Sequence, residues 1–72
     1  TLEVADIQKL IDALPEGYKA VFVLYAVEGY KHSEIAELLQ ISEGTSKSQL
    51  SKARKMLQQL VNKQNNTSYG TQ

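Results

Sequence analysis

The sequence predicts a small all-α domain of four helices, the last two of which have helix-turn-helix spacing. Three observations lead to this fold class. Apolar residues recur at helical intervals, Pro15 and Gly29 divide the chain into short segments, and the one segment that could be a strand has no partner to pair with. The 72 residues suffice for one domain, which we expect over 1–61, followed by a polar, disordered tail over 62–72.

The first two predicted helices meet at a proline. Residues 2–14 carry five apolar side chains on one helical face, namely Val4, Ile7, Leu10, Ile11 and Leu14. Pro15 ends this helix, because the residue before a proline is biased away from helical conformation, and it suits the first turn of the next helix. That second helix is predicted over Pro15 to Glu28. It is apolar nearly all round, which is typical of a central core helix, and Gly29 is its expected C-cap.

Residues 32–39 form the third predicted helix. Its expected inward side chains are Ile35, Ala36, Leu38 and Leu39. A tight turn over 40–42 follows. Ser42 is a favourable N-cap for the fourth helix, which we predict from Glu43 to Asn62, with the Glu43 carboxylate near the positive end of the helix dipole.

The fourth helix has two different faces on a helical wheel. The face expected to lie inward is apolar or small: Ser46, Leu50, Ala53, Leu57 and Leu60. The opposite face is basic and rich in hydroxyls: Thr45, Ser48, Ser51, Lys52, Lys55 and Gln59. Lys47 and Arg54 lie at one edge of the inward stripe, and Gln49 lies at the other. This arrangement fits the geometry in which the second helix of a helix-turn-helix enters the major groove.

The charge is unevenly distributed along the chain. Eight basic and eight acidic residues cancel overall, yet the first 43 residues carry a net charge of −5 and the remainder +5, with no acid after Glu43. The asymmetry indicates a polyanionic partner for the C-terminal part, although a dipolar solvated surface explains it equally well. Membrane-surface and calmodulin-like helices are also basic, but they need a bulkier apolar face than Leu, Ala and Ser provide.

The residue inventory argues against catalysis. There is no cysteine and one histidine, so we expect no disulfide, no metal site and no cofactor. His32 lacks the accompanying nucleophile and orienting carboxylate of a catalytic base, which leaves a phosphate contact or a plain surface residue. No run of 18 apolar residues is present to span a membrane. The chain opens with Thr1, and its only methionine is Met56, which indicates a piece of a longer protein.

Three consecutive segments resemble region 4 of bacterial sigma factors, most closely those of the extracytoplasmic-function subfamily. They are LPEGYKAVFVL at 14–24, GYKHSEIAELLQISEGT at 29–45 and SKSQLSKARK at 46–55. Their order and spacing match the family over about 14–61, and the helix-turn-helix of two-component regulators is the neighbouring family with a similar motif. The resemblance implies that the domain binds the −35 element of double-stranded promoter DNA. It also implies docking on the β flap of RNA polymerase core, an anti-sigma factor as a candidate partner, and a cytoplasmic location.

The resemblance assigns the DNA contacts residue by residue. Lys47, Ser48, Ser51 and Lys52 fall on the contact positions of the recognition helix, with Gln49 among them, and Lys31, His32 and Ser33 fall where contacts to the DNA backbone are expected. The helical wheel adds Thr45 and Lys55 to this candidate site. Lys47 and Gln49, at the edges of the wheel, depend more on the resemblance.

Three residues depart from the pattern of the family. Ser46 replaces the usual buried Val, and its hydroxyl is expected to bond a carbonyl one turn back. Gln49 replaces a common Arg, which would shift base preference from guanine toward adenine. Gln40 replaces the usual turn Gly, and it would be strained if that position requires a positive φ.

Two alternatives to DNA binding remain at this point. A helical domain that only binds protein would use the acidic, partly apolar N-terminal half, and both roles could coexist. An enzyme is disfavoured, because the sequence offers no nucleophile–base pair, no glycine-rich phosphate loop and no metal cluster. Salt-sensitive DNA binding would distinguish a DNA-binding domain from a domain that only binds protein.

Overall fold

The computed structural model describes residues 4–69, and it describes side chains over residues 6–63. Its elements are α1 (Val4–Asp12), α2 (Glu16–Phe22), the π-helix η1 (Val23–Val27), α3 (His32–Leu39) and α4 (Glu43–Tyr69). Every regular element in the described range is helical, so the predicted all-α class is confirmed.

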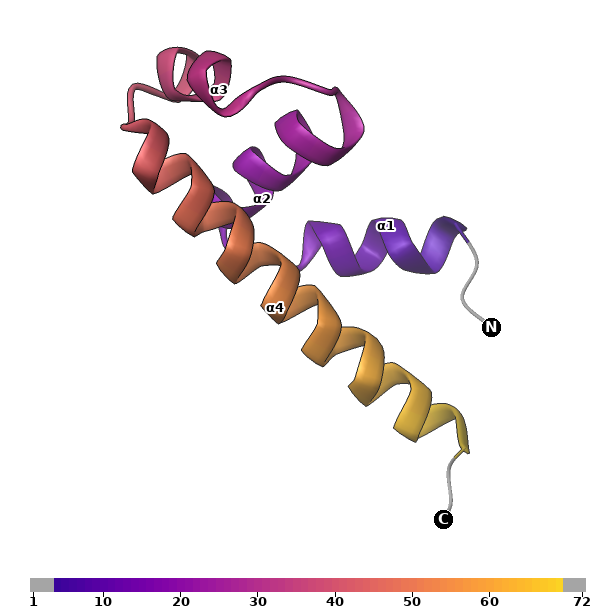
Figure 1. Ribbon diagram of the computed structural model, residues 1–72. Helices are drawn as coiled ribbons and strands as arrows, with labels where there is room; N and C mark the ends of the chain where they lie inside the picture. The colour runs from indigo at the N-terminus through magenta and orange to yellow at the C-terminus, as the bar shows by residue number, and fades with distance from the viewer. Residues whose placement is uncertain (1–3, 70–72) are drawn as a thin grey trace.

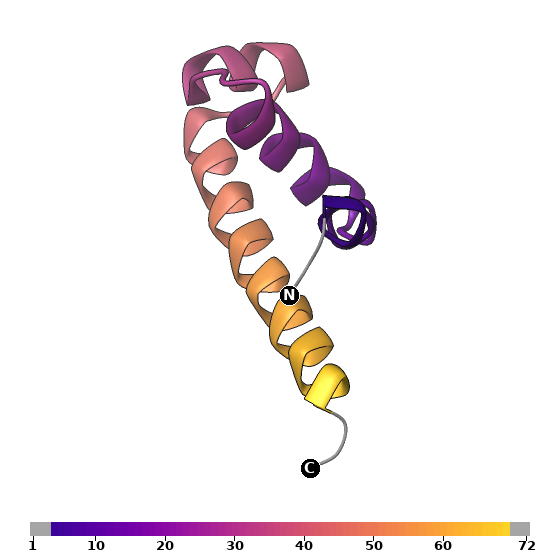
Figure 2. The ribbon, with the colours of Figure 1, turned by 90° about the vertical axis from the view of Figure 1, so that its right-hand side faces the viewer.

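α4 is the axis on which the other helices pack. Its 27 residues rise about 40 Å at the usual 1.5 Å per residue, and the molecule measures 45 Å along its longest axis. α3 crosses the beginning of α4, α2 runs beside the same half, and α1 meets α4 near its middle (Figures 1 and 2). The second half of α4 extends past the other helices.

The core is shared by three helices and is not centred on one. Val21 of α2, Ile35 of α3 and Leu50 of α4 form a buried cluster, with Phe22 and Leu39 among the partly buried residues around it. The second helix is therefore less central than its apolar sequence predicted.

One predicted inward residue points the wrong way. Leu38 was expected to face the core, but it is 56% exposed, whereas Ile35, three residues earlier, is fully buried. The eight residues of α3 present only a narrow stripe to α4, which Ile35 and Leu39 fill.

The second helix is neither a single α-helix nor the strand that residues 21–25 could have formed. After Phe22 the chain widens into η1, in which the Glu28 N–H donates to the Val23 carbonyl at 2.9 Å, one residue further back than in an α-helix. Gly29 follows with φ +85°, and the Tyr30 N–H donates to the Leu24 carbonyl at 2.9 Å. Gly29 therefore ends the element as predicted, although the C-cap residue itself is Glu28, one position earlier.

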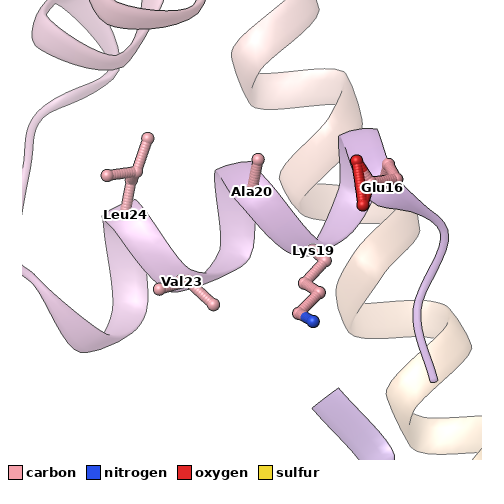
Figure 3. Close-up of a pocket in the computed structure, with 5 residues that line it drawn as sticks. All are labelled: Glu16, Lys19, Ala20, Val23 and Leu24. Atoms are coloured by element: carbon pink, nitrogen blue, oxygen red, sulfur yellow. The ribbon is translucent and has the colours of Figure 1, made fainter. Parts of the chain in front are cut away.

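An open hollow runs along α2 and η1 on the protein surface. Its lining is mainly apolar, with one charged side chain of each sign at its α2 end: Ala20, Val23, Leu24, Glu16 and Lys19 (Figure 3). The hollow is a surface feature and not an enclosed cavity.

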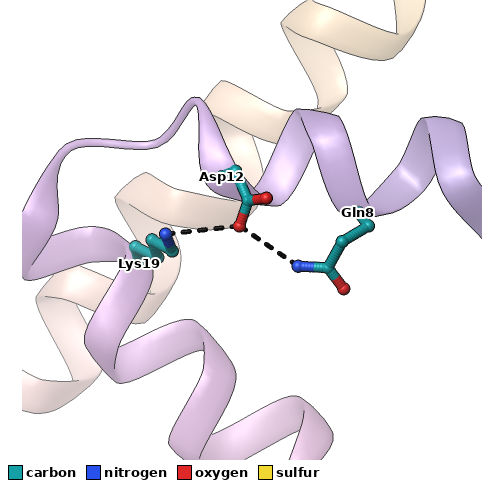
Figure 4. A network of polar contacts seen from close by, with 3 residues as sticks. All are labelled: Gln8, Asp12 and Lys19. Carbon is teal, nitrogen blue, oxygen red and sulfur yellow. Dashed lines mark hydrogen bonds and ion pairs between the residues drawn. The ribbon is translucent and has the colours of Figure 1, made fainter.

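α1 and α2 are linked by a small polar network. The Lys19 ammonium lies 3.2 Å from Asp12 Oδ1, and the Gln8 amide donates to the same oxygen at 3.1 Å (Figure 4). The hydrogen bonds from Gln8 and Lys19 hold the pKa of Asp12 below its ordinary value of 3.8. Both members of the ion pair are more than a third exposed, so the solvent screens their attraction.

The bounds of α3 match the prediction, and the turn after it is left-handed. Gln40 has φ 59° and ψ 46°, the conformation that makes glycine the usual residue there. The Gln40 side-chain amide donates to the Glu37 carbonyl at 3.3 Å, and the Ile41 N–H donates to the Ala36 carbonyl at 3.0 Å. The expected backbone requirement at this position is therefore confirmed.

α4 continues beyond its predicted end at Asn62, through Tyr69. The sequence contains no proline or glycine between Gly44 and Gly70, so it offers no residue that would stop the helix at Asn62. This helical course differs from the disorder expected at 62–69, and residues 70–72 lie outside the described range. The division into a domain at 1–61 and a tail at 62–72 stays a prediction.

Candidate nucleic-acid interface

The candidate surface consists of the beginning of α3 and the outward face of the first half of α4. Seven of the ten predicted contact residues have exposed side chains: Lys31, Ser33, Lys47, Ser48, Ser51, Lys52 and Lys55. Three are half-buried: His32, Thr45 and Gln49. The inward stripe begins as predicted, with Ser46, Leu50 and Ala53 buried. The helical wheel therefore separates the two faces of α4, except that Thr45, from the outward face, and Gln49, from an edge, are half-buried.

Ser42 caps the start of α4 as predicted. The Thr45 N–H donates to Ser42 Oγ at 2.9 Å, and the Ser42 hydroxyl donates to Thr45 Oγ1 at 2.9 Å. The Thr45 hydroxyl is thus already engaged in the cap. Thr45 is better described as part of the support of this surface than as one of its free polar groups.

Ser46 bonds to a neighbouring helix and not to its own. We predicted that its hydroxyl would bond a carbonyl one turn back, but Ser46 Oγ lies 2.8 Å from His32 Nδ1. Ser46 has no exposed surface, so its hydroxyl needs a protein partner. His32 supplies that partner from the first position of α3, on the other side of the turn.

His32 is consequently turned inward, which the expected phosphate contact or surface position did not anticipate. Its ring stacks on Tyr25, with centroids 4.6 Å apart and 19° between the planes. Lys31 and Ser33, which flank it in sequence, remain exposed. These two therefore keep the orientation that a contact to DNA would need.

Tyr25 and Arg54 form a contact that the sequence did not reveal. The Arg54 guanidinium carbon lies 5.8 Å from the centroid of the Tyr25 ring, within range of a cation–π interaction. Arg54 was assigned only to an edge of the wheel, and Tyr25 only to a core helix. A basic residue at the border of an apolar stripe, facing a helix rich in aromatics, is the signal that could have indicated the pair.

Gln49 faces α2, so it departs from the expected role in base recognition. Its Oε1 is buried without a hydrogen-bond partner, in a hollow that Gly17, Val21 and Leu39 help to line. A Cβ added at Gly17 would lie 3.6 Å from that oxygen, which shows how closely α2 approaches. A side chain directed there does not present its amide to a base edge.

The beginning of α3 carries one acidic group beside its basic one. The Lys31 N–H donates to Glu34 Oε1 at 2.8 Å, so the Glu34 carboxylate folds back on the helix start. The outward face of α4 differs, because its sequence contains no acid after Glu43. The most positive part of the candidate surface is therefore on α4.

Two further properties bear on the kind of site. No helix of the described range combines the length and the apolar character needed to cross a membrane. Within the same range, no group of three or more His, Cys, Asp or Glu side chains could hold a metal ion.

Comparison with known proteins gives a consistent assignment. The family model described as "Sigma-70, region 4" matches residues 5–57. The ECF RNA polymerase sigma factor SigE of Mycolicibacterium smegmatis is 34% identical over 59 residues, which are 82% of this chain and 23% of that protein. This chain thus spans less than a quarter of the length of that relative. No solved structure matches. On its sequence, its helical fold and these two matches, the chain belongs to the sigma-70 region 4 family, in the form found in ECF sigma factors.

Proposed function

We propose that this domain binds double-stranded promoter DNA at the −35 element, as part of a sigma factor that directs RNA polymerase to start transcription. The observation that carries the proposal is the outward face of α4, where Lys52 and Lys55 are exposed among small serines and no carboxylate follows Glu43. The similarity to an RNA polymerase sigma factor supports the same role. Such a role belongs in the cytoplasm.

The chemistry of the surface suits a duplex. Lysines attract phosphates and release the counterions condensed on DNA, which makes binding salt-dependent. Ser48 and Ser51 are short, so the α4 backbone can approach the floor of the major groove while Lys47 and Lys52 reach past them. The domain performs no reaction in this mechanism, because it positions a polymerase that does.

Lys52→Ala tests the proposal. We expect weaker binding to a duplex that carries a −35 sequence, and a slope of log K against log salt concentration that is smaller by about one unit. Lys9→Ala is the matched control, since it removes the same charge from an exposed residue of α1. Unchanged affinity and slope for Lys52→Ala would remove this residue from the interface.

A map of amide shifts locates the whole surface. In a titration of the domain with the same duplex at low salt, we expect NMR shifts at 31–33 and 44–55, and few in α1. If the serines face bases and the lysines face phosphates, a duplex of scrambled sequence should shift the amide signals of the lysines but not those of the serines. Shifts confined to α1 and α2, or none at all, would contradict the proposal.

A second role, docking on the β flap of the polymerase, has its own observation. The open hollow along α2 and η1 is mainly apolar (Figure 3). Elsewhere on the surface, Leu38 of α3 is 56% exposed. An apolar surface of this kind suits a protein partner, either the flap or an anti-sigma factor. Titration with a flap fragment should shift residues 19–24 and leave 47–52 unmoved, and the reverse pattern would contradict this second role.

A further inference from the structure

The contact between His32 and Ser46 joins the two ends of the proposed DNA surface. His32 is the first residue of α3, and Ser46 is in the first turn of α4. Their side chains meet at 2.8 Å between Nδ1 and Oγ. Each lies next to proposed contact residues, His32 between Lys31 and Ser33, and Ser46 before Lys47. This hydrogen bond therefore ties together the two segments that carry these contact residues.

Burial makes the bond costly to lose. Ser46 has no exposed surface, and a buried hydroxyl left without a partner loses its hydration with nothing to compensate for it. In the neutral ring that carries its proton on Nε2, the Ser46 hydroxyl donates to Nδ1. The bond therefore disfavours any rotation of α3 on α4 that would separate the two atoms.

The ring of His32 is held from a second direction. Tyr25 stacks on it at 4.6 Å between centroids, and the Arg54 guanidinium lies 5.8 Å from the Tyr25 ring. Tyr25 belongs to η1, and Arg54 to the fourth turn of α4. The imidazole is thus held by Tyr25 of η1, which precedes α3, and by Ser46 of α4, which follows it, whereas a surface histidine would rotate freely.

We infer that His32 is a positioning residue for DNA binding: through Ser46, and backed by Tyr25, it fixes the angle at which the start of α4 stands against the start of α3. The inference rests on the proposed function, because it concerns the same surface. It replaces the phosphate contact expected for His32 with an indirect role. It also gives a reason for serine at position 46, where an apolar residue would leave Nδ1 without this partner.

Four variants separate the indirect role from a direct contact. His32→Phe keeps a ring that can stack on Tyr25 but has no nitrogen, and Ser46→Ala removes only the hydroxyl. His32→Asn has a polar atom bonded to Cγ, as Nδ1 is. His32→Gln has its amide one bond further out, where Nε2 would be. Thermal unfolding of each variant sets an assay temperature at which all are folded.

We expect the affinity for a −35 duplex to fall about fivefold in His32→Phe and in Ser46→Ala. The double variant should bind about as weakly as either one alone, because both remove the same interaction. His32→Asn should recover most of the affinity, and His32→Gln should not.

Three results would overturn the inference. The first is recovery by His32→Gln and not by His32→Asn, which is the signature of a phosphate contact through Nε2. The second is a double variant whose losses multiply, since the two residues would then act separately. The third is unchanged affinity with a lower Tm, which means that the pair only stabilises the fold.

Lys52→Ala in the same assay distinguishes a failure of the positioning role from a failure of the proposed DNA binding. If Lys52→Ala weakens binding while the His32 and Ser46 variants bind like wild type, only the positioning role is wrong. If wild type and Lys52→Ala bind equally and without salt dependence, the proposed DNA binding is wrong, and the inference falls with it.

Discussion

Two polar junctions between helices, both within the part of the chain that the structure describes, differ in their exposure to water. α1 and α2 are joined by Asp12 and Lys19, whose side chains are 53% and 38% exposed. α3 and α4 are joined by His32 and Ser46, and Ser46 has no exposed surface. Water can replace the partners at the first junction but not at the second. The polar junction of the helix-turn-helix is thus harder to replace than the one between α1 and α2, which suits a surface that must match a duplex.

The largest effect should come from the core beneath the second junction. Ile35 is fully buried between Val21 and Leu50, so Ile35→Ala should lower the free energy of unfolding by about 2–5 kcal/mol. In a domain this small, that loss lowers the Tm by roughly 10 °C or more. Leu38→Ala is the control, because its side chain is 56% exposed and should cost much less. Equal losses in a thermal melt would mean that α3 packs on α4 by another face.

The cap of α4 should be the next most important feature. Ser42→Ala removes the acceptor of the Thr45 N–H and should cost about 1 kcal/mol. Ser48→Ala is the matched control, since it makes the same change at an exposed position of the same helix. We would measure urea unfolding followed by circular dichroism. A larger loss for Ser48→Ala than for Ser42→Ala would contradict the assignment of the cap.

A substitution at Gln40, in the turn between α3 and α4, should stabilise the domain. Gln40 occupies the left-handed region, where glycine is free of the strain that a Cβ causes. Gln40→Gly also loses the 3.3 Å bond to Glu37 and makes the unfolded chain more flexible, so the net gain should be roughly 0.5 kcal/mol. We expect a small rise in Tm for Gln40→Gly and a fall for Gln59→Gly, which places glycine within the exposed face of α4. A fall in both would show that the lost bond outweighs the strain.

Local sequence signals were sufficient for most of the fold. Pro15, Gly29 and Ser42 each act within a few residues, so the boundaries that they set match the structure closely. The π-turn of η1 and the exposure of Leu38 depend on packing against other helices, which no local pattern encodes. α4 is longer than predicted, because a polar composition does not by itself end a helix and no residue between Asn62 and Tyr69 prevents one.

In α4, the exposure of a candidate site residue was predictable only where the residue lies far from the border between the inward and outward faces. Lys52 lies opposite the apolar stripe and is exposed as expected, whereas Gln49 and Lys47 lie at its two edges. α2 packs along the edge that holds Gln49 and covers it, so the tertiary structure decides between two positions that the wheel treats alike. The partnership of His32 and Ser46 spans 14 residues and depends on how α3 crosses α4. A helical wheel contains no information about that crossing.

The smallest effect should come from the first junction, and it should depend on pH. The pKa of Asp12 is lowered in the folded state by hydrogen bonds from Gln8 and Lys19, so its contribution to stability is present above the ordinary value of 3.8. That contribution is lost as the pH falls through the folded pKa, because the unfolded chain then binds the proton more readily. Asp12→Asn should therefore destabilise the domain slightly near neutral pH and make little difference at acidic pH. Lys19→Met should show the same convergence in urea melts across this range, since it removes one of the same bonds. A difference between wild type and Asp12→Asn that grows on acidification would mean that this carboxylate is not stabilised in the folded domain, and the contrast between the two junctions would then rest on His32 and Ser46 alone.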